Sequence, residues 1–547
     1  MHPAASYNGP VGVGVDLGSS SVRVGAYSLE NDSLLHVVER PVRYYSCGSS
    51  GRFTQSTGEI MAALQECLDE LGLRPGGRSI ASCGVAATCS MAVFAVEAGG
   101  GSLEPLDVSG LDGSSDKNVV FWMDSVASEA CGALNKRLGT HVKAALCGGF
   151  IPEMGVPKLL HLVGQFPSRS LEVFDLHKYI AYDLARRYGW DTVPLANRPN
   201  SNGIGHDGEV GGWPQAFYQN VLKLPATAAV GPVSTFKGQR VGIASCIDCY
   251  ASWFGVCSAQ PEQSLFLVAG TSTCYLYASA TSKTVVPGVW GPFTNLLDGE
   301  QARWSVYEAG QSTTGRLLEH LFETHPAARD YAGDAGRLFK DLENRIAGME
   351  ADSGCSIHHL ARHMFLYGEL QGNRTPYADP RMCGMFVGET TDTSFANLAL
   401  KYVVVLEFLA FQTRQIVEGF RTGAAAAIGE LRVAGSQAKN RRLLSLMSLV
   451  NGNMPVRVPA RAASLAGVRG AYLLGKSRYL DVSLLDVVRK PGATIPTVEV
   501  TESSNYPACG ATKENLRRLL EAKYAIHLDM AQVQQRYRSE IDAVVAQ

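Results

Sequence analysis

The sequence predicts an α/β protein built from two similar domains that face one cleft. Its 547 residues exceed the length that a single hydrophobic core usually holds, so two large domains are expected. Apolar runs typical of strands alternate with amphipathic stretches typical of helices. A unit of strand, small polar turn and returning strand occurs twice, at residues 11–27 and 264–279. Because each unit heads an α/β stretch, the two domains are expected to share one architecture.

The first of these turns has the residue types of a phosphate-binding and metal-binding turn. The first strand brings Asp16 to its end, the turn contains Gly18, Ser19 and Ser20, and Arg23 follows on the returning strand. Gly18 allows the backbone to bend and to approach a ligand closely. The N–H groups and hydroxyls of such a turn can bind phosphate, and a carboxylate at a strand end can hold a divalent cation. An ordinary hairpin with a serine-rich turn has the same pattern, so the turn alone does not decide.

The composition excludes several classes of partner. The net charge is −2 and no basic tract or acidic tail is present, so neither nucleic acid nor a membrane is an expected partner. The first ten residues lack the charged and apolar regions of a signal peptide, and no uninterrupted apolar run approaches membrane-spanning length. We therefore expect a soluble, cytoplasmic protein. Its 13 cysteines, including the closely spaced Cys246 and Cys249, are expected to be reduced and buried.

Hydrophobic periodicity predicts the remaining elements. Helices are expected at residues 56–71, 157–165, 176–188, 395–419, 439–450 and 462–474. Strands are expected at residues 34–42, 79–87, 91–97, 118–123, 264–269, 275–279, 430–434 and 455–458. Residues 99–117 are rich in Gly, Ser and Asp and are expected to form an exposed loop. Residues 512–547 are expected to add polar helices that pack on the second domain.

The second turn differs from the first in one informative way. It contains Gly270, Thr271 and Ser272 and has no carboxylate before the glycine. Actin-like and chaperone-like ATPases are expected to place an acid in that second turn. The absence of an acid therefore indicates the sugar kinases, which belong to the same superfamily as these ATPases.

Eight sequence blocks carry a resemblance to a known family. They are VDLGSSSVR (15–23), ATCS (87–90), FWMD (121–124), GGFIPEMGVPKLL (148–160), LVAGTSTC (267–274), VPGVWGPF (286–293), EAGQSTTG (308–315) and QGNRTPYADPRMCGM (371–385). With these blocks the chain resembles the FGGY carbohydrate kinases over about residues 11–475, and within them the ribulokinase-like branch. The resemblance implies two RNase H-like domains of the actin/hexokinase superfamily facing a central cleft. It places a sugar-binding domain at residues 1–258, a nucleotide-binding domain at 259–480 and a helical extension at 481–547.

The resemblance also implies roles for individual residues. Asp16 would hold Mg²⁺, and Asp248 would be the catalytic base. The sugar would be bound by Trp122, Asp124, Glu153 and Thr88. ATP would be bound by Gly18, Ser19, Ser20, Arg23, Gly270, Thr271, Ser272, Gly310, Gln311, Ser312, Gly435, Ser436 and Asn440. These types suit phosphoryl transfer, because an attacking hydroxyl needs a carboxylate to accept its proton and the phosphate needs cations and N–H groups around it.

Several of these residues also have a structural interpretation. Trp122 is of a type that usually packs in a core, and Glu153 lies in a Gly- and Pro-rich segment where it could simply be solvated. Asp124 could cap the helix that follows it. Asp248 could cap a helix beginning at Tyr250.

Asp379 and Arg381 have a functional and a structural interpretation. Both lie in the block at residues 371–385. We favour the interpretation that their side chains pair with each other and shape a loop.

The sequence also departs from the family at a few positions. Ala86 stands where the branch usually has an acid, and Ser436 where a second glycine is common. Around the expected base, Ser245, Tyr250 and Ser252 replace a glycine, a histidine and a glycine. These departures affect the sugar and the turnover more than nucleotide binding.

The expected function is ATP-dependent, Mg²⁺-assisted phosphorylation of a small sugar, a ketopentose such as D-ribulose. The alternatives are a catalytically weak sugar- or nucleotide-binding regulatory protein, motivated by Ala86 and the altered flank of Asp248, and a kinase of another ketose or a polyol. The expected partners are the sugar and ATP, and the sequence sets no oligomeric state.

Overall fold

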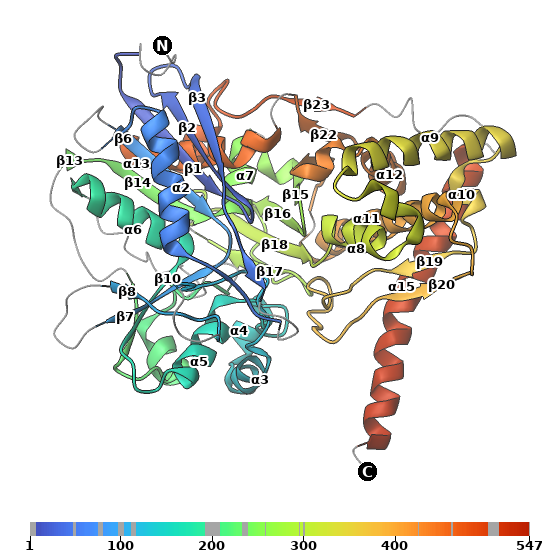
Figure 1. Cartoon of the computed structure of the whole chain (residues 1–547), viewed down its shortest axis with the longest axis horizontal. Coiled ribbons are helices and arrows are strands. Elements are labelled where there is room, and N and C mark those ends of the chain that lie inside the picture. The colour runs from blue at the N-terminus through green and yellow to red at the C-terminus, as the bar shows by residue number, and fades with distance from the viewer. Residues whose placement is uncertain are drawn as a thin grey trace. The chain divides into compact units, whose positions relative to one another are not determined.

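The chain forms two compact units whose segments alternate along the sequence (Figure 1). The computed structural model describes residues 7–46, 51–74, 80–96, 103–110, 116–191, 208–231, 239–257, 259–294, 296–298, 301–424, 426–460, 463–500 and 513–545. The first unit contains residues 1–262, 276–308 and 459–496, and the second contains residues 263–275, 309–458 and 497–547. This grouping by compactness differs from the consecutive ranges expected from the sequence, which stay a prediction.

The first unit contains a five-stranded mixed sheet of the order β14-β6-β1-β2-β3. Neighbours β1, β2 and β3 run antiparallel, whereas β1, β6 and β14 run parallel. This is the strand arrangement of an RNase H-like domain, so the predicted fold class is confirmed for this unit. The strands are β1 (Val11–Leu17), β2 (Ser21–Ser28), β3 (Leu34–Pro41), β6 (Ile80–Ala87) and β14 (Gly242–Ile247).

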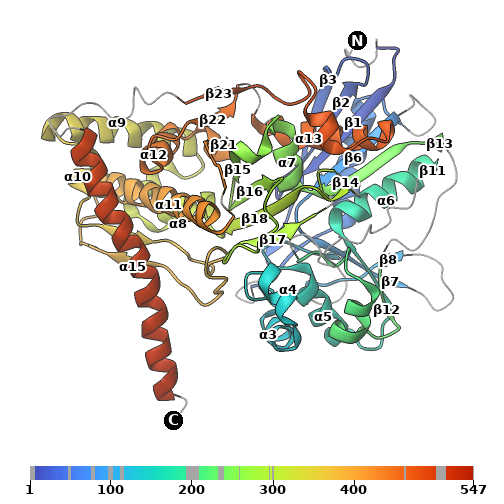
Figure 2. The same ribbon diagram turned by 180° about the vertical axis from the view of Figure 1, so that it is seen from behind.

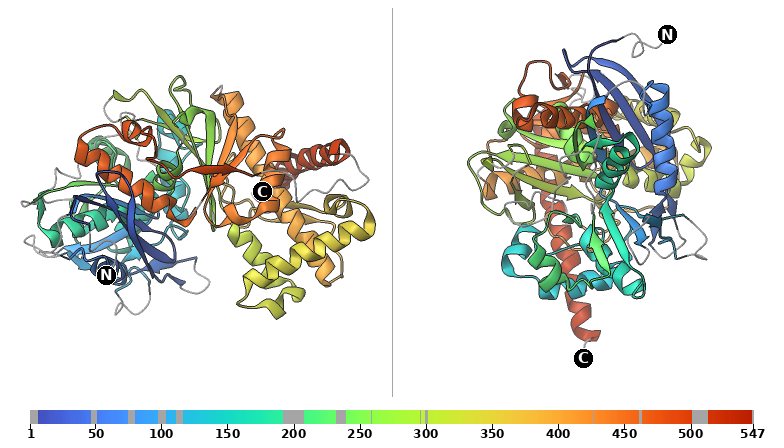
Figure 3. Two further views of the ribbon diagram at one scale, coloured as in Figure 1. Left: turned by 90° about the horizontal axis from the view of Figure 1, so that it is seen from above. Right: turned by 90° about the vertical axis from the view of Figure 1, so that its left-hand side faces the viewer.

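Helices cover both faces of this sheet (Figure 3). On one face, α13 (Ala466–Leu480) packs against β1, β6 and β14. On the other, α2 (Thr57–Glu70) packs against β2 and β3, and α6 (Leu176–Tyr188) against β6 and β14. The predicted helices at 56–71 and 176–188 are thus confirmed, and Ser56 caps the first of them by accepting a hydrogen bond from the Glu59 N–H.

Glycines allow α13 to lie unusually close to its neighbours. A Cβ on Gly84 of β6 would come within 1.6 Å of the Ala471 carbonyl oxygen. A Cβ on Gly470 would come within 1.7 Å of the Ala251 carbonyl oxygen on α7 (Asp248–Val256). Because both obstacles are backbone atoms, they cannot rotate out of the way. The contacts therefore fix α13 against the sheet and against α7.

Replacing Gly470 by Ala is expected to destabilise the protein by about 1–3 kcal/mol, because the methyl group overpacks a backbone contact. The matched control is Gly348→Ala in α9 (Ala335–Ser353), where an added Cβ meets nothing within 4 Å. That variant is expected to be up to about 1 kcal/mol more stable, since Ala favours a helix over Gly. Urea denaturation measures both, and equal stabilities would contradict the prediction.

A second, mainly antiparallel sheet completes the first unit. Its order is β12-β10-β7-β9-β5-β4, with β8 paired to β7. Two predictions are corrected here. The expected loop at 99–117 contains a short strand, β8, among its described residues, and the strand expected at 118–123 is reduced to β9. The strands are β4 (Tyr45–Ser46), β5 (Phe53–Gln55), β7 (Met91–Val96), β8 (Leu103–Pro105), β9 (Val119–Val120), β10 (Leu171–Asp175) and β12 (Ala228–Val230).

The other elements of the first unit are short. The helices are α3 (Ser128–Arg137), α4 (Thr140–Ala145), α5 (Gly155–Gln165) and α14 (Leu484–Val488). The strands are β11 (Trp190–Asp191), β13 (Gln239–Arg240) and β17 (Trp290–Phe293). The chain passes between the units within β16 (Thr273–Ser279) and within β18 (Ser305–Gln311).

The second unit contains three parallel strands in the order β15-β21-β22. β15 (Ser264–Ala269) and β21 (Glu430–Ala434) have the predicted bounds, and β22 (Val456–Pro459) is shifted by one residue from the prediction. The remaining strands are β19 (Phe365–Tyr367), β20 (Met385–Val387) and β23 (Thr497–Glu499). The helices are α8 (Gly315–Thr324), α9, α10 (Ile357–Leu360), α11 (Phe395–Gly423), α12 (Arg441–Val450) and α15 (Lys513–Val545).

Helix α11 forms the core of the second unit. It is long and apolar enough to cross a membrane by length and composition alone, and 78% of its most apolar window is buried inside the structure. Helices α8, α9, α10, α12 and α15 all pack against it or its neighbours. Burial on this scale is what a core helix requires.

The long C-terminal helix α15 packs within the second unit, past α10, α11 and β19 (Figure 2). It also corrects the pairing expected for Asp379 and Arg381. The Arg381 guanidinium donates to Asp542 at 2.9 Å, and Asp379 accepts from Arg538, so both partners lie on α15. The structural interpretation of the two residues holds, but each side chain fastens the loop to the helix rather than to the other.

Candidate functional site

The parallel strands of the first unit bring three predicted residues to one edge. In register, Asp16 of β1 lies beside Ala86 of β6, and Ala86 lies beside Cys246 of β14. The carboxyl ends of these strands therefore present Asp16, Thr88 and Asp248 together. In open α/β sheets this is the edge at which ligands bind.

Asp16 at this edge has a strongly perturbed pKa. It is only 7% exposed. Burial first, and then the charge of the Asp248 carboxylate, raise its pKa from 3.8 to about 7. Arg23 lowers that pKa in part, since its guanidinium lies 3.9 Å from the Asp16 carboxylate and also pairs with Glu39 at 2.7 Å. A buried acid whose pKa is raised by desolvation and by a neighbouring acid is typical of a functional site.

Position 86 lies beside Asp16, so the residue there affects the charge at this sheet edge. Neighbours in register point to the same face of a sheet, so an acid at Ala86 would lie directly beside Asp16. Ala86 is fully buried. With alanine at position 86, this edge has no third carboxylate there beside Asp16 and Asp248.

Sequence reasoning missed Gly467, which lies against Asp16 from the first turn of α13. A Cβ at this position would come within 2.4–2.7 Å of the Asp16 carboxyl atoms. Any larger residue would thus displace the carboxylate. The only available signal was the small residue near the start of a predicted helix, about 450 positions from Asp16.

The turn after β1 is closed by its own backbone and touches Trp122. The Gly18 N–H donates to the Ser21 carbonyl at 2.9 Å. The Trp122 indole N–H donates to the Ser19 hydroxyl at 3.0 Å. Ser20 is exposed. Trp122 is only partly buried, so it is not a core aromatic, and its ring contributes to the surroundings of the turn.

Asp124 lies behind this tryptophan and is 1% exposed. One of its oxygens accepts from the Phe53 N–H at 2.9 Å and the other from the Val126 N–H at 3.2 Å. It does not cap α3, whose N-cap is Ala127, so the capping interpretation is wrong. The carboxylate instead fixes the backbone of the segment that carries Trp122.

Thr88 and Glu153 occupy different surroundings. The Thr88 hydroxyl is buried and shares a hydrogen bond of 2.9 Å with Ser90. Glu153 is partly exposed, in the turn that precedes α5.

Asp248 is the first residue of α7 and is partly exposed. The helix begins at Asp248 with Ile247 at the N-cap, so Asp248 does not cap a helix beginning at Tyr250. One carboxylate oxygen accepts from the Cys249 N–H at 2.8 Å. The side chain thus projects from the point where β14 becomes α7.

In the second unit, the turn after β15 is also closed by a hydrogen bond from its glycine. The Gly270 N–H donates to the Ser272 carbonyl, two residues ahead, at 2.9 Å, whereas the Gly18 N–H donates to the Ser21 carbonyl, three residues ahead. The Gly270 and Thr271 carbonyls accept from the Gly315 and Thr314 N–H groups, both at 2.9 Å, at the start of α8. The prediction of two strand–turn–strand units is therefore confirmed, although the hydrogen bonds that close the two turns differ.

A second turn of this unit lies beside the first. Val268 and Ala434 are partners in register, so Gly435 follows β21 at the same sheet edge. A Cβ on Gly435, which has a φ of 88°, would come within 2.4 Å of the Ala269 carbonyl oxygen. Ser436 is exposed. Asn440 caps α12 by accepting from the Leu443 N–H at 3.1 Å.

Gly310, Gln311 and Ser312 are buried and hydrogen-bonded inside the second unit. The Gly310 N–H donates to the Thr375 hydroxyl at 3.1 Å. The Gln311 amide donates to the Gln412 side-chain oxygen at 3.2 Å, and the Ser312 hydroxyl donates to the Gly372 carbonyl at 2.8 Å. These side chains support the sheet edge from within.

A buried cluster in the first unit has the residue types of a metal site. Asp175, His177 and Glu209 have ligand atoms within 4.8 Å of one another. The Lys178 ammonium, however, lies 2.6 Å from Asp175 and 3.0 Å from Glu209, so it already supplies the positive charge there. His177 also shares hydrogen bonds with Glu209 at 2.8 Å and with Ser245 of β14 at 2.9 Å. The cluster therefore holds β14 and α6 together.

Comparison with known proteins extends these local observations to the whole chain. Residues 265–476 match the C-terminal domain of the FGGY family of carbohydrate kinases. The chain is 45% identical over 543 residues to Protein MPA43 of Saccharomyces cerevisiae, covering 98% of both chains. It is 28% identical to a D-ribulokinase of the same yeast, covering 86% of this chain and 72% of that one. Its fold is similar to that of a ligand-bound xylulose kinase from Lactobacillus acidophilus, with a TM-score of 0.67 and 15% identity over 96% of this chain and 100% of that one. The chain therefore belongs to the FGGY family of carbohydrate kinases, in its ribulokinase-like branch.

Proposed function

We propose that the protein transfers the terminal phosphate of ATP to a hydroxyl of a small sugar, a ketopentose such as D-ribulose. The observation that carries the proposal is the pair of acids at one sheet edge, Asp16 and Asp248. The burial of Asp16 and then the nearby Asp248 charge raise the pKa of Asp16 to about 7. The choice of sugar is supported by the D-ribulokinase among the relatives.

Asp248 is the proposed general base. It is partly exposed at the start of α7, so a sugar hydroxyl can reach its carboxylate. Accepting the hydroxyl proton as the oxygen attacks the phosphate contributes about 10²–10⁴-fold to such reactions. Trp122, Glu153 and Thr88 are the proposed sugar contacts, and Asp124 is proposed to act through the backbone that it holds.

Asp16 is the proposed Mg²⁺ ligand, and its surroundings fit a divalent cation. Its carboxylate is desolvated and lies near a second carboxylate, and a bound cation offsets both costs. When bound, Mg²⁺ neutralises charge on the phosphate oxygens. Beside it, the Gly18 turn and Arg23 supply N–H, hydroxyl and guanidinium donors for the transferring phosphate.

The second unit is proposed to bind the nucleotide. The turns at 270–272 and 435–436 lie at one sheet edge and expose Thr271 and Ser436. Such turns can direct backbone N–H groups at phosphates. Asn440 and the buried residues 310–312 are proposed to shape the nucleotide side.

A coupled ADP-release assay over pentoses, pentitols, trioses and hexoses tests the proposal. We expect saturable turnover with the highest kcat/KM for a ketopentose. A higher kcat/KM for a polyol or another ketose would change the proposed substrate and leave the proposed kinase activity in place. Binding of sugar and ATP by calorimetry without turnover on any substrate would overturn the kinase and support a regulatory binding protein.

A further inference from the structure

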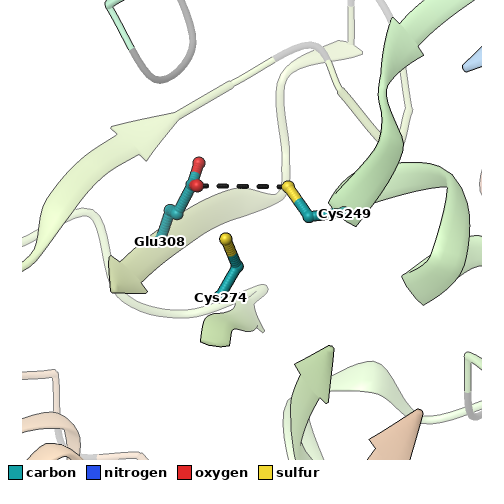
Figure 4. Close-up of side chains that lie close together, drawn as sticks. All are labelled: Cys249, Cys274 and Glu308. Carbon is teal, nitrogen blue, oxygen red and sulfur yellow. Dashed lines mark hydrogen bonds between the residues drawn. The ribbon is translucent and has the colours of Figure 1, made fainter. Parts of the chain in front are cut away.

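Two side chains from the first turn of α7 reach the same buried carboxylate. The Tyr250 hydroxyl donates to one oxygen of Glu308 at 2.5 Å. The Cys249 thiol lies 4.0 Å from the other oxygen, as Figure 4 shows. Glu308 is fully buried, and Tyr250 and Cys249 are 1% and 3% exposed. Burying a carboxylate destabilises the folded protein unless the carboxylate accepts hydrogen bonds. Losing these donors would therefore destabilise the protein.

This contact lies next to Asp248, the proposed base, whose carboxylate must point toward the substrate. Asp248 directly precedes Cys249 and Tyr250 and begins the same helical turn. Its carboxylate accepts from the Cys249 N–H, so the backbone of that turn sets where the carboxylate points. Glu308 is far away in sequence, on β18, and therefore fixes the turn from outside the helix.

The strand side of the same corner is also fastened. Ser245 of β14, three residues before Asp248, shares a hydrogen bond of 2.9 Å with the His177 ring. Farther along α7, Gly255 and Ala251 contact α13 through backbone. The orientation of the first turn of α7 thus depends on side-chain hydrogen bonds, and Tyr250 supplies a short one to the Glu308 carboxylate.

We propose that Tyr250 and Glu308 are positioning residues for Asp248, which hold the first turn of α7 so that the carboxylate faces the attacking hydroxyl. The proposal rests on the proposed function of Asp248. It assigns the hydrogen bond a catalytic consequence beyond its contribution to stability. Small misplacements of a reacting group reduce rates steeply, so loss of this bond lowers turnover more than substrate binding.

The variants distinguish a misplaced Asp248 carboxylate from a general loss of folding stability. Tyr250→Phe removes the donor, Glu308→Met removes the acceptor at similar volume, and Glu308→Gln keeps an acceptor. Tyr188→Phe is the matched control, because the Tyr188 hydroxyl donates to the Leu73 carbonyl at the far end of α6. We expect Tyr250→Phe and Glu308→Met to lower kcat by roughly 10- to 100-fold with KM for ATP unchanged. Glu308→Gln and Tyr188→Phe are expected to stay within about threefold of the unmodified protein.

The double variant Tyr250→Phe with Glu308→Met gives the decisive comparison. Replacing both partners by apolar groups removes the unpaired buried carboxylate, so Tm recovers toward that of the unmodified protein. The proposal expects kcat to stay low in this variant. Recovery of kcat together with Tm, or an unchanged kcat in Tyr250→Phe, would overturn it.

A measurement without substrate keeps the two proposals apart. Hydrogen exchange at the amides of α7 is expected to be faster in Tyr250→Phe than in Tyr188→Phe at equal global stability. If the unmodified protein phosphorylates no sugar, the proposed function fails and exchange still decides whether the contact holds the turn. Equal exchange of the α7 amides in the two variants would contradict the positioning role.

Discussion

Replacing Asp248 by Asn is expected to lower kcat by roughly 10²–10⁴-fold, the usual contribution of a general base. The amide has nearly the same shape as the carboxylate and can still accept from the Cys249 N–H, so the start of α7 is expected to persist. It cannot take up the hydroxyl proton at neutral pH. Steady-state kinetics with saturating sugar and ATP measures the change.

Nucleotide binding separates loss of the base from general damage. The dissociation constant for ATP, measured by calorimetry, is expected to stay within about twofold in Asp248→Asn, because Asp248 is not a proposed ATP contact and the proposed nucleotide turns at 270–272 and 435–436 belong to the other unit. Asp69→Asn, on the surface of α2, serves as the control for removing one carboxylate and is expected to be fully active. A kcat equal to that of the unmodified protein in Asp248→Asn would reject Asp248 as the base.

Replacing Asp16 by Asn is expected to abolish most activity and at the same time to stabilise the protein above pH 7. Raising the pKa of Asp16 from 3.8 to about 7 corresponds to a folding cost on the order of 4 kcal/mol when the group is ionised. Asn has no such cost. Activity falls because the proposed Mg²⁺ ligand is lost.

The sign of the pH dependence follows from the protons bound. Between about pH 4 and pH 7 the folded protein keeps the Asp16 proton that the unfolded chain has already released. This contribution to stability is therefore lost as the pH rises through that window. The difference in unfolding free energy between Asp16→Asn and the unmodified protein should grow from pH 4 to pH 7 and then level off.

Urea denaturation at several pH values measures that difference. Titrating groups that do not interact with Asp16 affect both proteins equally and cancel in it. Mg²⁺ is expected to stabilise the unmodified protein above pH 7 but not the variant, because binding to the folded state alone raises stability. A difference that stays constant with pH would contradict the raised pKa.

The sequence predicted the elements best where their apolar pattern was sharp. Helix α6 and strands β15 and β21 have the predicted bounds, and the two strand–turn–strand units lie where they were expected. Strand β8 was missed, since three residues in a Gly- and Ser-rich stretch leave little periodicity to detect.

Contacts between distant segments could not be predicted from the sequence. The contact of Gly467 with Asp16 joins segments about 450 residues apart, and a small residue in a helix has many other causes. Asp379 and Arg381 were expected to pair with each other because they are neighbours, but α15 offers each an opposite charge. The burial of Asp124 depends on Phe53 and Val126, whose N–H groups carry no signal in the sequence. The roles assigned to the site residues stay predictions.

The alternation of segments has a consequence for how the protein is made. The chain leaves or re-enters the first unit after residues 262, 275, 308, 458 and 496. During synthesis, β1 and β6 leave the ribosome long before α13, the helix that covers their glycine-lined face. Until α13 emerges, this face of the nascent sheet lacks its native cover, and such surfaces are prone to aggregate. The acidic edge that includes Asp16 is thus completed only after about 450 further residues have been made.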